Sequence, residues 1–360
     1  MKRMSRRITR KIKVGDVEVG GGAQISVQSM TNTRTSDVDA TVAQIDRLTR
    51  AGCEIVRVAV PDEGAADSLK EIKFRISIPL VADIHFRHDF AIKAIDSGVD
   101  CVRINPGNIG SDEKLRTVIE AAKSRGVPIR IGVNSGSVEP HLLKKFGKPT
   151  PEAMVESALH HVRILEGMDF HDIKISVKAS NVLDTIESYR MLSDKVDYPL
   201  HLGVTEAGSL LAGAIKSALG IGTLLLDGIG DTLRVSLTAD VVQEVRAAYE
   251  ILADAGIRQR PFPEVVSCPT CGRAQIDLEG LARRIEDRLI GIRAPIKVAV
   301  MGCVVNGPGE AKEADIGVAG GDGKGVIFKA GKILTTCDEA DIEKILVSEV
   351  EKIAEEMDKK

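Results

Sequence analysis

Between residues 25 and 240, short apolar runs alternate with longer amphipathic stretches along the chain. The amphipathic stretches, such as Asp37–Ala51 and Ser111–Ser124, begin with helix-capping residues and are soon followed by glycine, as helices usually are. The apolar runs are short and rich in β-branched residues, which is typical of buried parallel strands. They are Ile25–Met30, Glu54–Val60, Leu80–Ile84, Cys101–Ile104, Ile129–Val133, Asp172–Val177, Leu200–Val204 and Thr223–Asp227. Eight β–α units in this length predict an α/β fold, a (β/α)8 barrel of the TIM type.

A doubly wound sheet is the alternative with the same alternation of strands and helices. Such sheets usually carry a phosphate-binding turn, but no G-x-G-x-x-G sequence follows the first strand and no G-x-x-x-x-G-K-[ST] sequence occurs. We therefore favour the barrel and predict neither dinucleotide nor ATP binding.

The β–α rhythm breaks at Arg258–Val266, a stretch that contains two prolines. We place a domain boundary there, with a barrel domain over residues 1–257 and a second domain over residues 258–360. Asp277 and Asp338 are the expected N-caps of two helices in the second domain. Its predicted elements make a small α+β unit, with a helix at Asp277–Ile290, a strand at Ile296–Met301, short strands to about Thr336 and a helix at Asp338–Met357.

Two segments of the barrel domain stand outside the β–α repeat. Residues 1–13 carry seven basic residues and no acidic one, and Gly15-Asp16 then predicts a small hairpin. A nucleic-acid arm or a transit peptide are the functional interpretations of the basic segment, and a short solvated edge is the simpler one. After the fifth strand, residues 134–151 predict a loop of about a dozen residues or more, either a lid or a surface insertion.

Composition excludes several functional classes. The net charge is −3 and tryptophan is absent, which argues against nucleic acid as a partner. No apolar run approaches the roughly 18 residues that a membrane span needs, and no signal-peptide core is present. Six cysteines in 360 residues are too few for a disulfide scaffold, so we expect a reducing, cytoplasmic compartment.

Basic residues near the C-terminal ends of five predicted strands are expected to surround one cavity, because barrels carry their chemistry at that end. Their like charges repel one another, so an anion is expected among them. Arginine forks match phosphate oxygens, and a diphosphate carries a suitable charge. The basic residues are Arg57, Arg103, Arg130, Lys178 and Arg234, with Asp83, His85, Asn134, Thr205 and Ser236 beside them.

Glu206 is a carboxylate among these cations. Three interpretations are open for it: an acid/base group, an anchor for a substrate hydroxyl, or a counter-ion of Arg234.

The second domain contains a metal-binding pattern. Cys268 and Cys271 form a C-x2-C pair, and Cys303 begins the segment Cys303-Val-Val-Asn306-Gly-Pro-Gly-Glu310. A C-x2-C pair directs two thiolates at one metal, and a third cysteine on a glycine-rich loop is expected to reach the same ion. Three thiolates suit an iron–sulfur cluster, and they also suit zinc.

These motifs together resemble a known family. Cys268-Pro-Thr-Cys271-Gly, Met301-Gly-Cys303-Val-Val-Asn306-Gly-Pro-Gly-Glu310, Ser26-Val-Gln-Ser-Met30-Thr-Asn-Thr and Val204-Thr-Glu206-Ala-Gly are similar to segments of the bacterial 4-hydroxy-3-methylbut-2-enyl diphosphate synthases, iron–sulfur enzymes of the non-mevalonate isoprenoid pathway. The resemblance covers essentially the whole chain.

The resemblance implies a [4Fe-4S] cluster held by Cys268, Cys271, Cys303 and Glu310. It implies a small-molecule substrate, 2-C-methyl-D-erythritol 2,4-cyclodiphosphate, whose ring is opened by two electrons with loss of a hydroxyl as water. Flavodoxin or ferredoxin is the implied electron donor. A head-to-tail homodimer is implied, in which the cluster domain of one chain caps the barrel of the other.

The resemblance also implies roles for individual residues. Glu206 and Glu310 are the expected catalytic residues. Glu310 is the exchangeable cluster ligand, since a carboxylate is harder and more labile on iron than a thiolate. The expected substrate-binding residues are Arg57, Arg103, Arg130, Asn134, Lys178, Thr205, Arg234, Ser236 and Asn306.

Two rival functions remain. One is a zinc-dependent barrel hydrolase or lyase acting on a phosphorylated substrate, with Cys337 as the fourth zinc ligand. The other is a non-enzymatic cluster carrier, which has no use for a ring of cations and Glu206 at a barrel mouth. Metal analysis of an anaerobic preparation tests the first rival: zinc would support it, and iron with sulfide would exclude it.

Overall fold

The structure is a computed structural model that describes residues 5–109, 111–303 and 313–359. The chain divides into two compact units, Met1–Ile257 and Arg258–Lys360. In the described ranges, no helix has both the length and the apolar character that crossing a membrane requires.

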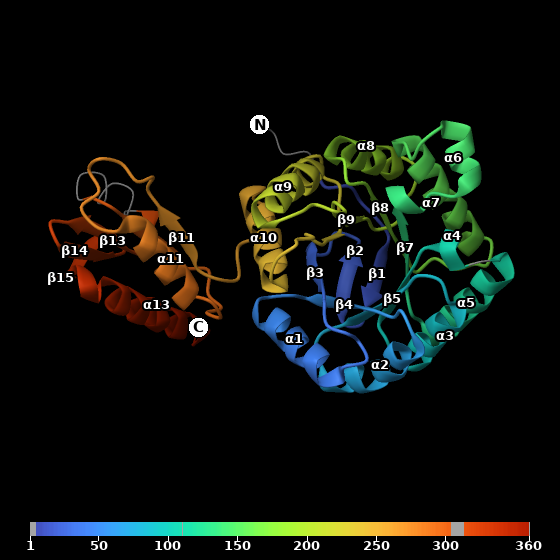
Figure 1. Cartoon of the computed structure of the whole chain (residues 1–360), viewed down its shortest axis with the longest axis horizontal. Coiled ribbons are helices and arrows are strands. Elements are labelled where there is room, and N and C mark those ends of the chain that lie inside the picture. Colours follow the sequence, from blue (N-terminus) through green and yellow to red (C-terminus); the bar gives the residue numbers. More distant parts are fainter. Residues whose placement is uncertain (1–4, 110, 304–312, 360) are drawn as a thin grey trace. The chain divides into compact units, whose positions relative to one another are not determined.

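The first unit is a barrel of parallel strands inside a ring of helices (Figure 1). In the described part of the chain its sheet has eight strands in the order β8-β7-β6-β5-β4-β3-β10-β9. A parallel bridge between Ile175 and Leu200 links the two outer strands of this order. The strands are β3 (Ser26–Met30), β4 (Ile55–Ala59), β5 (Leu80–Ile84), β6 (Cys101–Ile104), β7 (Ile129–Asn134), β8 (Ile173–Lys178), β9 (His201–Leu202) and β10 (Thr232–Leu233).

The helices of this unit follow the strands, as the amphipathic pattern predicts. Asp37 and Ser111 cap the helices that they precede, the first by accepting a hydrogen bond from Ala40 N at 3.1 Å. The helices are α1 (Val38–Arg50), α2 (Glu63–Arg75), α3 (His88–Asp96), α4 (Pro106–Ile109), α5 (Asp112–Arg125), α6 (Pro140–Phe146), α7 (Pro151–Glu166), α8 (Val182–Ser193), α9 (Leu210–Leu226) and α10 (Val241–Asp254).

Seven of the eight predicted strands are confirmed, and the eighth is wrong. The run Thr223–Asp227 forms the last turn of α9 and its C-cap. This helix is apolar along nearly its whole length, and a short apolar run does not distinguish a buried strand from a buried helix. The true eighth strand is β10, whose two residues pair with β3 and β9 and are too few to show a pattern.

The predicted N-terminal hairpin is confirmed as β1 (Lys11–Val14) paired with β2 (Val17–Gly20). Its apolar side chains pack against Ile55, Val81 and Cys101, which lie at the starts of barrel strands, so the hairpin covers the N-terminal end of the barrel. Basic residues before it are engaged with the barrel. Arg6 pairs with Asp231 at 3.1 Å and Arg10 with Asp197 at 2.9 Å.

The connection after β7 is helical where the sequence predicts a loop. A 3-10 turn, η1 (Ser135–Ser137), and helix α6 occupy most of it before α7 begins. Helix α6 is seven residues long and buries Leu142, and a segment of this length is too short to show a helical period.

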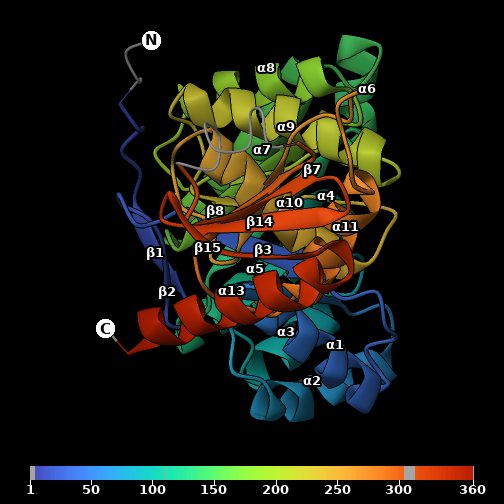
Figure 2. The same cartoon turned by 90° about the vertical axis from the view of Figure 1, so that its left-hand side faces the viewer.

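The second unit is a mixed five-stranded sheet with helices, as predicted. In its described residues the order is β11-β12-β13-β14-β15, parallel as far as β13 and antiparallel afterwards. Figure 2 shows α13 extending alongside this sheet. The apolar side chains of α13 share a core with those of α11 and of the sheet. The elements are β11 (Glu264–Ser267), α11 (Leu278–Arg288), β12 (Lys297–Met301), β13 (Ile316–Gly321), β14 (Lys324–Lys329), β15 (Lys332–Asp338), η3 (Glu339–Asp341) and α13 (Ile342–Asp358).

The two expected N-caps of this unit have different outcomes. Asp277 caps α11 by accepting a hydrogen bond from Gly280 N at 3.1 Å, as predicted. Asp338 ends β15 and precedes η3, so the final α-helix begins at Ile342 and not at Asp338. The last strand therefore extends further than the predicted limit near Thr336.

Candidate active site

A cavity of about 260 Å³ lies at the C-terminal ends of the barrel strands. All eight of the described residues that the sequence predicts to bind substrate line it. The lining residues are Met30, Arg57, Asp83, His85, Arg103, Arg130, Asn134, Ser176, Lys178, Val204, Thr205, Arg234 and Ser236.

Strand geometry explains why these side chains converge. Successive residues of a strand point to opposite faces, so every second residue faces the barrel interior. On β7 and β8, Arg130 is in register with Lys174, and Asn134 with Lys178. The inward-facing side chains of Arg130, Asn134 and Lys178 reach the cavity, whereas Lys174 is buried outside its lining.

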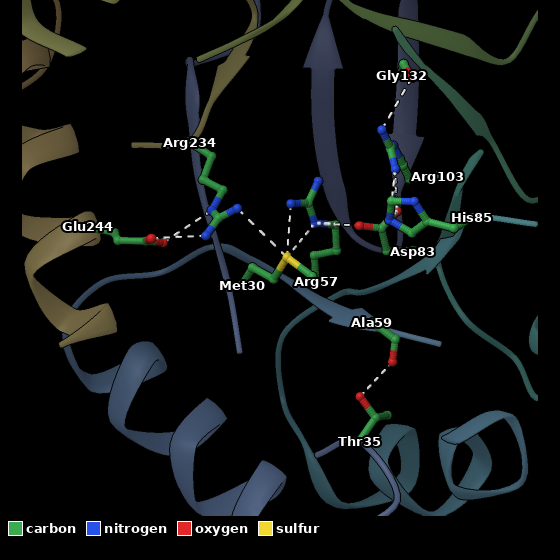
Figure 3. A network of polar contacts seen from close by, with 10 residues as sticks. All are labelled: Met30, Thr35, Arg57, Ala59, Asp83, His85, Arg103, Gly132, Arg234 and Glu244. Atoms are coloured by element: carbon green, nitrogen blue, oxygen red, sulfur yellow. Dashed lines mark hydrogen bonds and ion pairs between the residues drawn. The ribbon is translucent and has the colours of Figure 1, made fainter. Parts of the chain in front are cut away.

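Asp83, on β5, binds two of the cations. It is 3.5 Å from Nε of Arg57 and 2.9 Å from Nη1 of Arg103 (Figure 3). Burial alone would raise the pKa of Asp83, but the charges of Arg57 and Arg103 outweigh it and hold that pKa well below its usual range. Asp83 is therefore ionised and neutralises part of the positive charge.

Glu244, on α10, is the partner of Arg234. Its carboxylate is 2.9 Å from Nη2 of Arg234 and also accepts hydrogen bonds from Ser29 Oγ at 2.8 Å and Leu237 N at 3.1 Å. Glu244 is 2% exposed. The carboxylate that pairs with Arg234 is thus Glu244 and not Glu206, and sequence reasoning missed it. The available signal was a charged residue on the apolar stripe of a helix, beside Val241 and Val245.

Two guanidinium groups of the cavity point at the sulfur of Met30 (Figure 3). Sδ of Met30 lies 2.9 Å from Nη2 of Arg57 and 3.7 Å from Nη1 of Arg234. A thioether is a weak acceptor, so both groups keep most of their hydrogen-bonding capacity for an anion.

Among the described residues, Arg130 and Lys178 have no carboxylate partner. Arg130 is 1% exposed, and its Nε and Nη1 atoms find no hydrogen-bond acceptor among the described residues. Burial, reinforced by the charge of Arg103, lowers the pKa of Arg130 to about 10. Lys178 forms no ion pair with any described residue. Unsatisfied buried cations are costly, so the cavity is built for a multiply charged anion.

Glu206 occupies a different position from these residues. It is exposed, and it is absent from the described lining of the cavity, which includes its neighbour Thr205. Its φ of 52° is in the left-handed region, which costs a non-glycine residue about 1–2 kcal/mol. Such strain is concentrated at functional sites.

Gly132 provides the space for Arg103. A Cβ atom at this position would lie 2.4 Å from Nε of Arg103. We therefore expect Gly132→Ala to displace the guanidinium and weaken binding of a phosphate anion by roughly tenfold, the cost of about one charge-assisted hydrogen bond. Calorimetric titration measures this, and Gly136→Ala, where nothing lies within 4 Å, is the matched control. Equal affinity in the two variants would contradict the role of Gly132.

In the second unit, Cys268 and Cys303 follow adjacent parallel strands. Cys268 comes directly after β11 and Cys303 two residues after β12, and Ser267 is in register with Val300. The amide of Gly302 donates a hydrogen bond to Sγ of Cys268 at 3.4 Å. Strand pairing thus brings Cys268 against the backbone that directly precedes Cys303.

Cys271 differs from the two cysteines of the barrel unit in its exposure and its surroundings. Cys271 is exposed, and hydrogen bonds from Arg273 lower the pKa of its thiol, which favours the thiolate form that metals require. Cys53 and Cys101 are buried in the barrel, where burial raises the pKa of each thiol.

No three His, Cys, Asp or Glu side chains within residues 5–109, 111–303 and 313–359 gather closely enough to hold a metal ion. Glu310 and Asn306, which the sequence assigns to the cluster and the substrate, lie outside the described residues. The thiol chemistry and the two adjacent strand ends fit a metal centre.

The chain is similar to known proteins along almost its full length. Residues 9–249 match the GcpE TIM-barrel domain and residues 264–352 match the GcpE protein C-terminal domain. A relative from Caldanaerobacter subterraneus subsp. tengcongensis, 4-hydroxy-3-methylbut-2-en-1-yl diphosphate synthase (flavodoxin), is 61% identical over 98% of this chain and 99% of its own length. A relative of the same name from Clostridium perfringens is 59% identical over 97% of this chain and 100% of its own length.

Among solved structures, dihydropteroate synthase from Yersinia pestis covers 68% of this chain and 98% of its own, with a TM-score of 0.49 and 12% identity, too distant to inform the chemistry. The two domain matches and the full-length relatives are decisive: the chain belongs to the GcpE family.

Proposed function

We propose that this protein converts 2-C-methyl-D-erythritol 2,4-cyclodiphosphate to 4-hydroxy-3-methylbut-2-enyl diphosphate by a two-electron reductive ring opening. The observation that carries the proposal is the cavity at the barrel mouth. Five cationic side chains of the described chain line it, and Asp83 and Glu244 neutralise only part of their charge. The names of the relatives support the identity of the product.

The cations are proposed to bind the diphosphate and to stabilise the charge that appears on it. When the ring C–O bond breaks, the diphosphate gains negative charge on the released oxygen. Arg130 and Lys178 have no competing carboxylate in the described part of the chain and bind most directly, while Asp83 and Glu244 hold the other guanidinium groups in place. Groups fixed before the reaction need no reorganisation as charge develops, which is the main source of electrostatic catalysis.

The neutral lining residues and Glu206 are proposed to handle the sugar. Asn134, Thr205 and Ser236 line the same cavity and offer hydrogen bonds to hydroxyl oxygens. The hydroxyl leaves as water and requires a proton, which we assign to Glu206 at the mouth. Its exposure keeps it in contact with solvent for reprotonation.

The two units are proposed to divide the work, with residues 1–257 binding the substrate and residues 258–360 holding a [4Fe-4S] cluster. Cys268, Cys271, Cys303 and Glu310 are the proposed ligands, and Asn306 is proposed to contact the substrate. When bound, a cluster of this kind supplies electrons one at a time. The Gly302 amide beside Cys268 suits a thiolate ligand, since N–H···S hydrogen bonds stabilise its negative charge.

The experiment that tests the function is turnover of the cyclic diphosphate by anaerobically purified protein. The purified protein is expected to contain iron and sulfide and to form product when reduced flavodoxin is supplied. A parallel assay with reduced ferredoxin shows which protein is the better electron donor, and the relatives' names favour flavodoxin. Zinc without sulfide, and hydrolysis without a reductant, would instead establish the zinc-dependent hydrolase or lyase.

We further propose that the active enzyme is a head-to-tail homodimer in which the second unit of one chain completes the barrel site of the other. Mixing a Glu206→Gln variant with a Cys271→Ser variant is then expected to restore activity, because a mixed dimer has one site with an intact barrel and an intact cluster unit. That hybrid reaches at most half the native activity, and each parent stays inactive. If labelled subunits demonstrably exchange and no activity returns, the site forms within one chain.

A further inference from the structure

Lys178 differs from the other cations of the cavity in both its chemistry and its surroundings. It is the last residue of β8, it lines the cavity, and it is 8% exposed. A Cβ atom at Gly203 would lie 2.4 Å from its Nζ, so the amine is held against the backbone after β9. No described carboxylate forms an ion pair with it.

The titratable and charged groups around Lys178 come from several strands of the barrel. Asp83 is engaged by Arg57 and Arg103, and Glu244 is engaged by Arg234, so neither acidic group is free to neutralise the lysine. The groups are Arg130 on β7, His201 on β9, Lys174 on β8 itself, Arg57 on β4, Arg103 on β6, Asp83 on β5, His85 after β5, and Arg234 after β10.

Among the five cations, only the lysine gives up its proton readily. The arginines stay protonated in proteins, whereas a buried lysine neutralises instead of holding an uncompensated charge. Burial, followed by the charges of Arg130 and Arg57, lowers the pKa of Lys178 well below its usual value. The buried neighbours Lys174 and His201 also have nitrogens without a described partner.

We propose that Lys178 is a proton-loading residue of the cavity: it is a neutral amine when the cavity holds no anion, and it takes up one proton from solvent when a polyanion binds. The step converts an amine and a solvent proton to an ammonium group, with no other bond made or broken. The cavity thereby carries less self-repulsion without ligand and gains a cation at the moment the anion enters. The inference needs only an anion in the cavity and does not depend on the identity of the substrate.

Proton uptake makes affinity depend on pH with a definite sign. The protein with the anion bound holds one proton more than the protein with an empty cavity. The affinity for the anion therefore falls as pH rises from the pKa of Lys178 in the empty cavity to its higher pKa in the complex. An arginine at position 178 is protonated in both states, so it removes this dependence.

The test is calorimetric titration at pH 8 with inorganic trimetaphosphate, a cyclic phosphate whose acid groups are fully ionised in neutral solution. Repeating the titration in buffers of different ionisation enthalpy gives the protons taken up per anion bound. About one proton is expected for the native protein, the stoichiometric limit of a single amine. Lys178→Arg is expected to bind the anion with no uptake, and Lys178→Met to bind more weakly with no uptake.

Lys174→Met is the matched control, since it removes a buried lysine from the same face of β8 outside the cavity lining. It should leave the uptake unchanged. Uptake that persists in both Lys178 variants, uptake lost only in Lys174→Met, or failure of the native protein to bind the anion would each overturn the inference. Failure to turn over the cyclic diphosphate would count against the proposed function alone.

Discussion

Replacement of Cys268 by serine is expected to remove the proposed iron–sulfur cluster and reduce turnover to background. Cys268 follows β11, beside the start of the loop that carries Cys303, and serine offers a poor ligand in place of a soft thiolate. Iron and sulfide analysis, with the visible spectrum of an anaerobic sample, measures the loss directly and independently of activity.

Cys337→Ser is the matched control for this prediction. Cys337 is half-buried on β15, burial raises the pKa of its thiol, and it is not one of the proposed ligands. This variant is expected to retain iron and turnover. A Cys268→Ser protein with full iron content would refute the proposed ligand set, and a Cys337→Ser protein without metal would favour the zinc alternative.

Arg234→Met and Arg130→Met are expected to weaken substrate binding similarly, but only Arg234→Met is expected to destabilise the fold. Each removes one charge-assisted contact with the diphosphate, which costs roughly 1.5–3 kcal/mol, or tenfold to about a hundredfold in affinity. Arg234→Met also leaves Glu244 buried without a cation, a change that typically costs about 3–5 kcal/mol of folding free energy.

Arg130→Met does not carry this cost in the empty protein. It removes unpaired buried donors and relieves repulsion from Arg103, so the ligand-free protein is expected to be at least as stable as the native one. Denaturant unfolding without ligand, paired with a titration of substrate, measures both quantities. Equal destabilisation of the two variants would show that Arg130 has a partner after all, and unchanged affinity in both would place the substrate elsewhere.

Most of the charged residues of the cavity can be predicted from the sequence, because the alternation of inward-facing and outward-facing residues depends only on neighbouring residues of one strand. Once a β-branched run predicts a strand, the inward face and the C-terminal end are determined, and Arg57, Arg103, Arg130 and Lys178 can be placed there. The same reasoning failed at the eighth strand, where two residues of β10 carry too little pattern and the apolar end of α9 resembles a strand.

The amino-acid sequence by itself determined the barrel, the second α+β unit, the cations at the strand ends and the cysteine pattern, since each depends on residue type and short-range spacing. The tertiary structure decided which charges are neutralised. Glu244 and Arg234 are ten residues apart in sequence, and they meet because α10 packs on the barrel where β10 joins β3. The same holds for Lys178: whether a described carboxylate pairs with it depends on all the strands around it, and no local pattern records that.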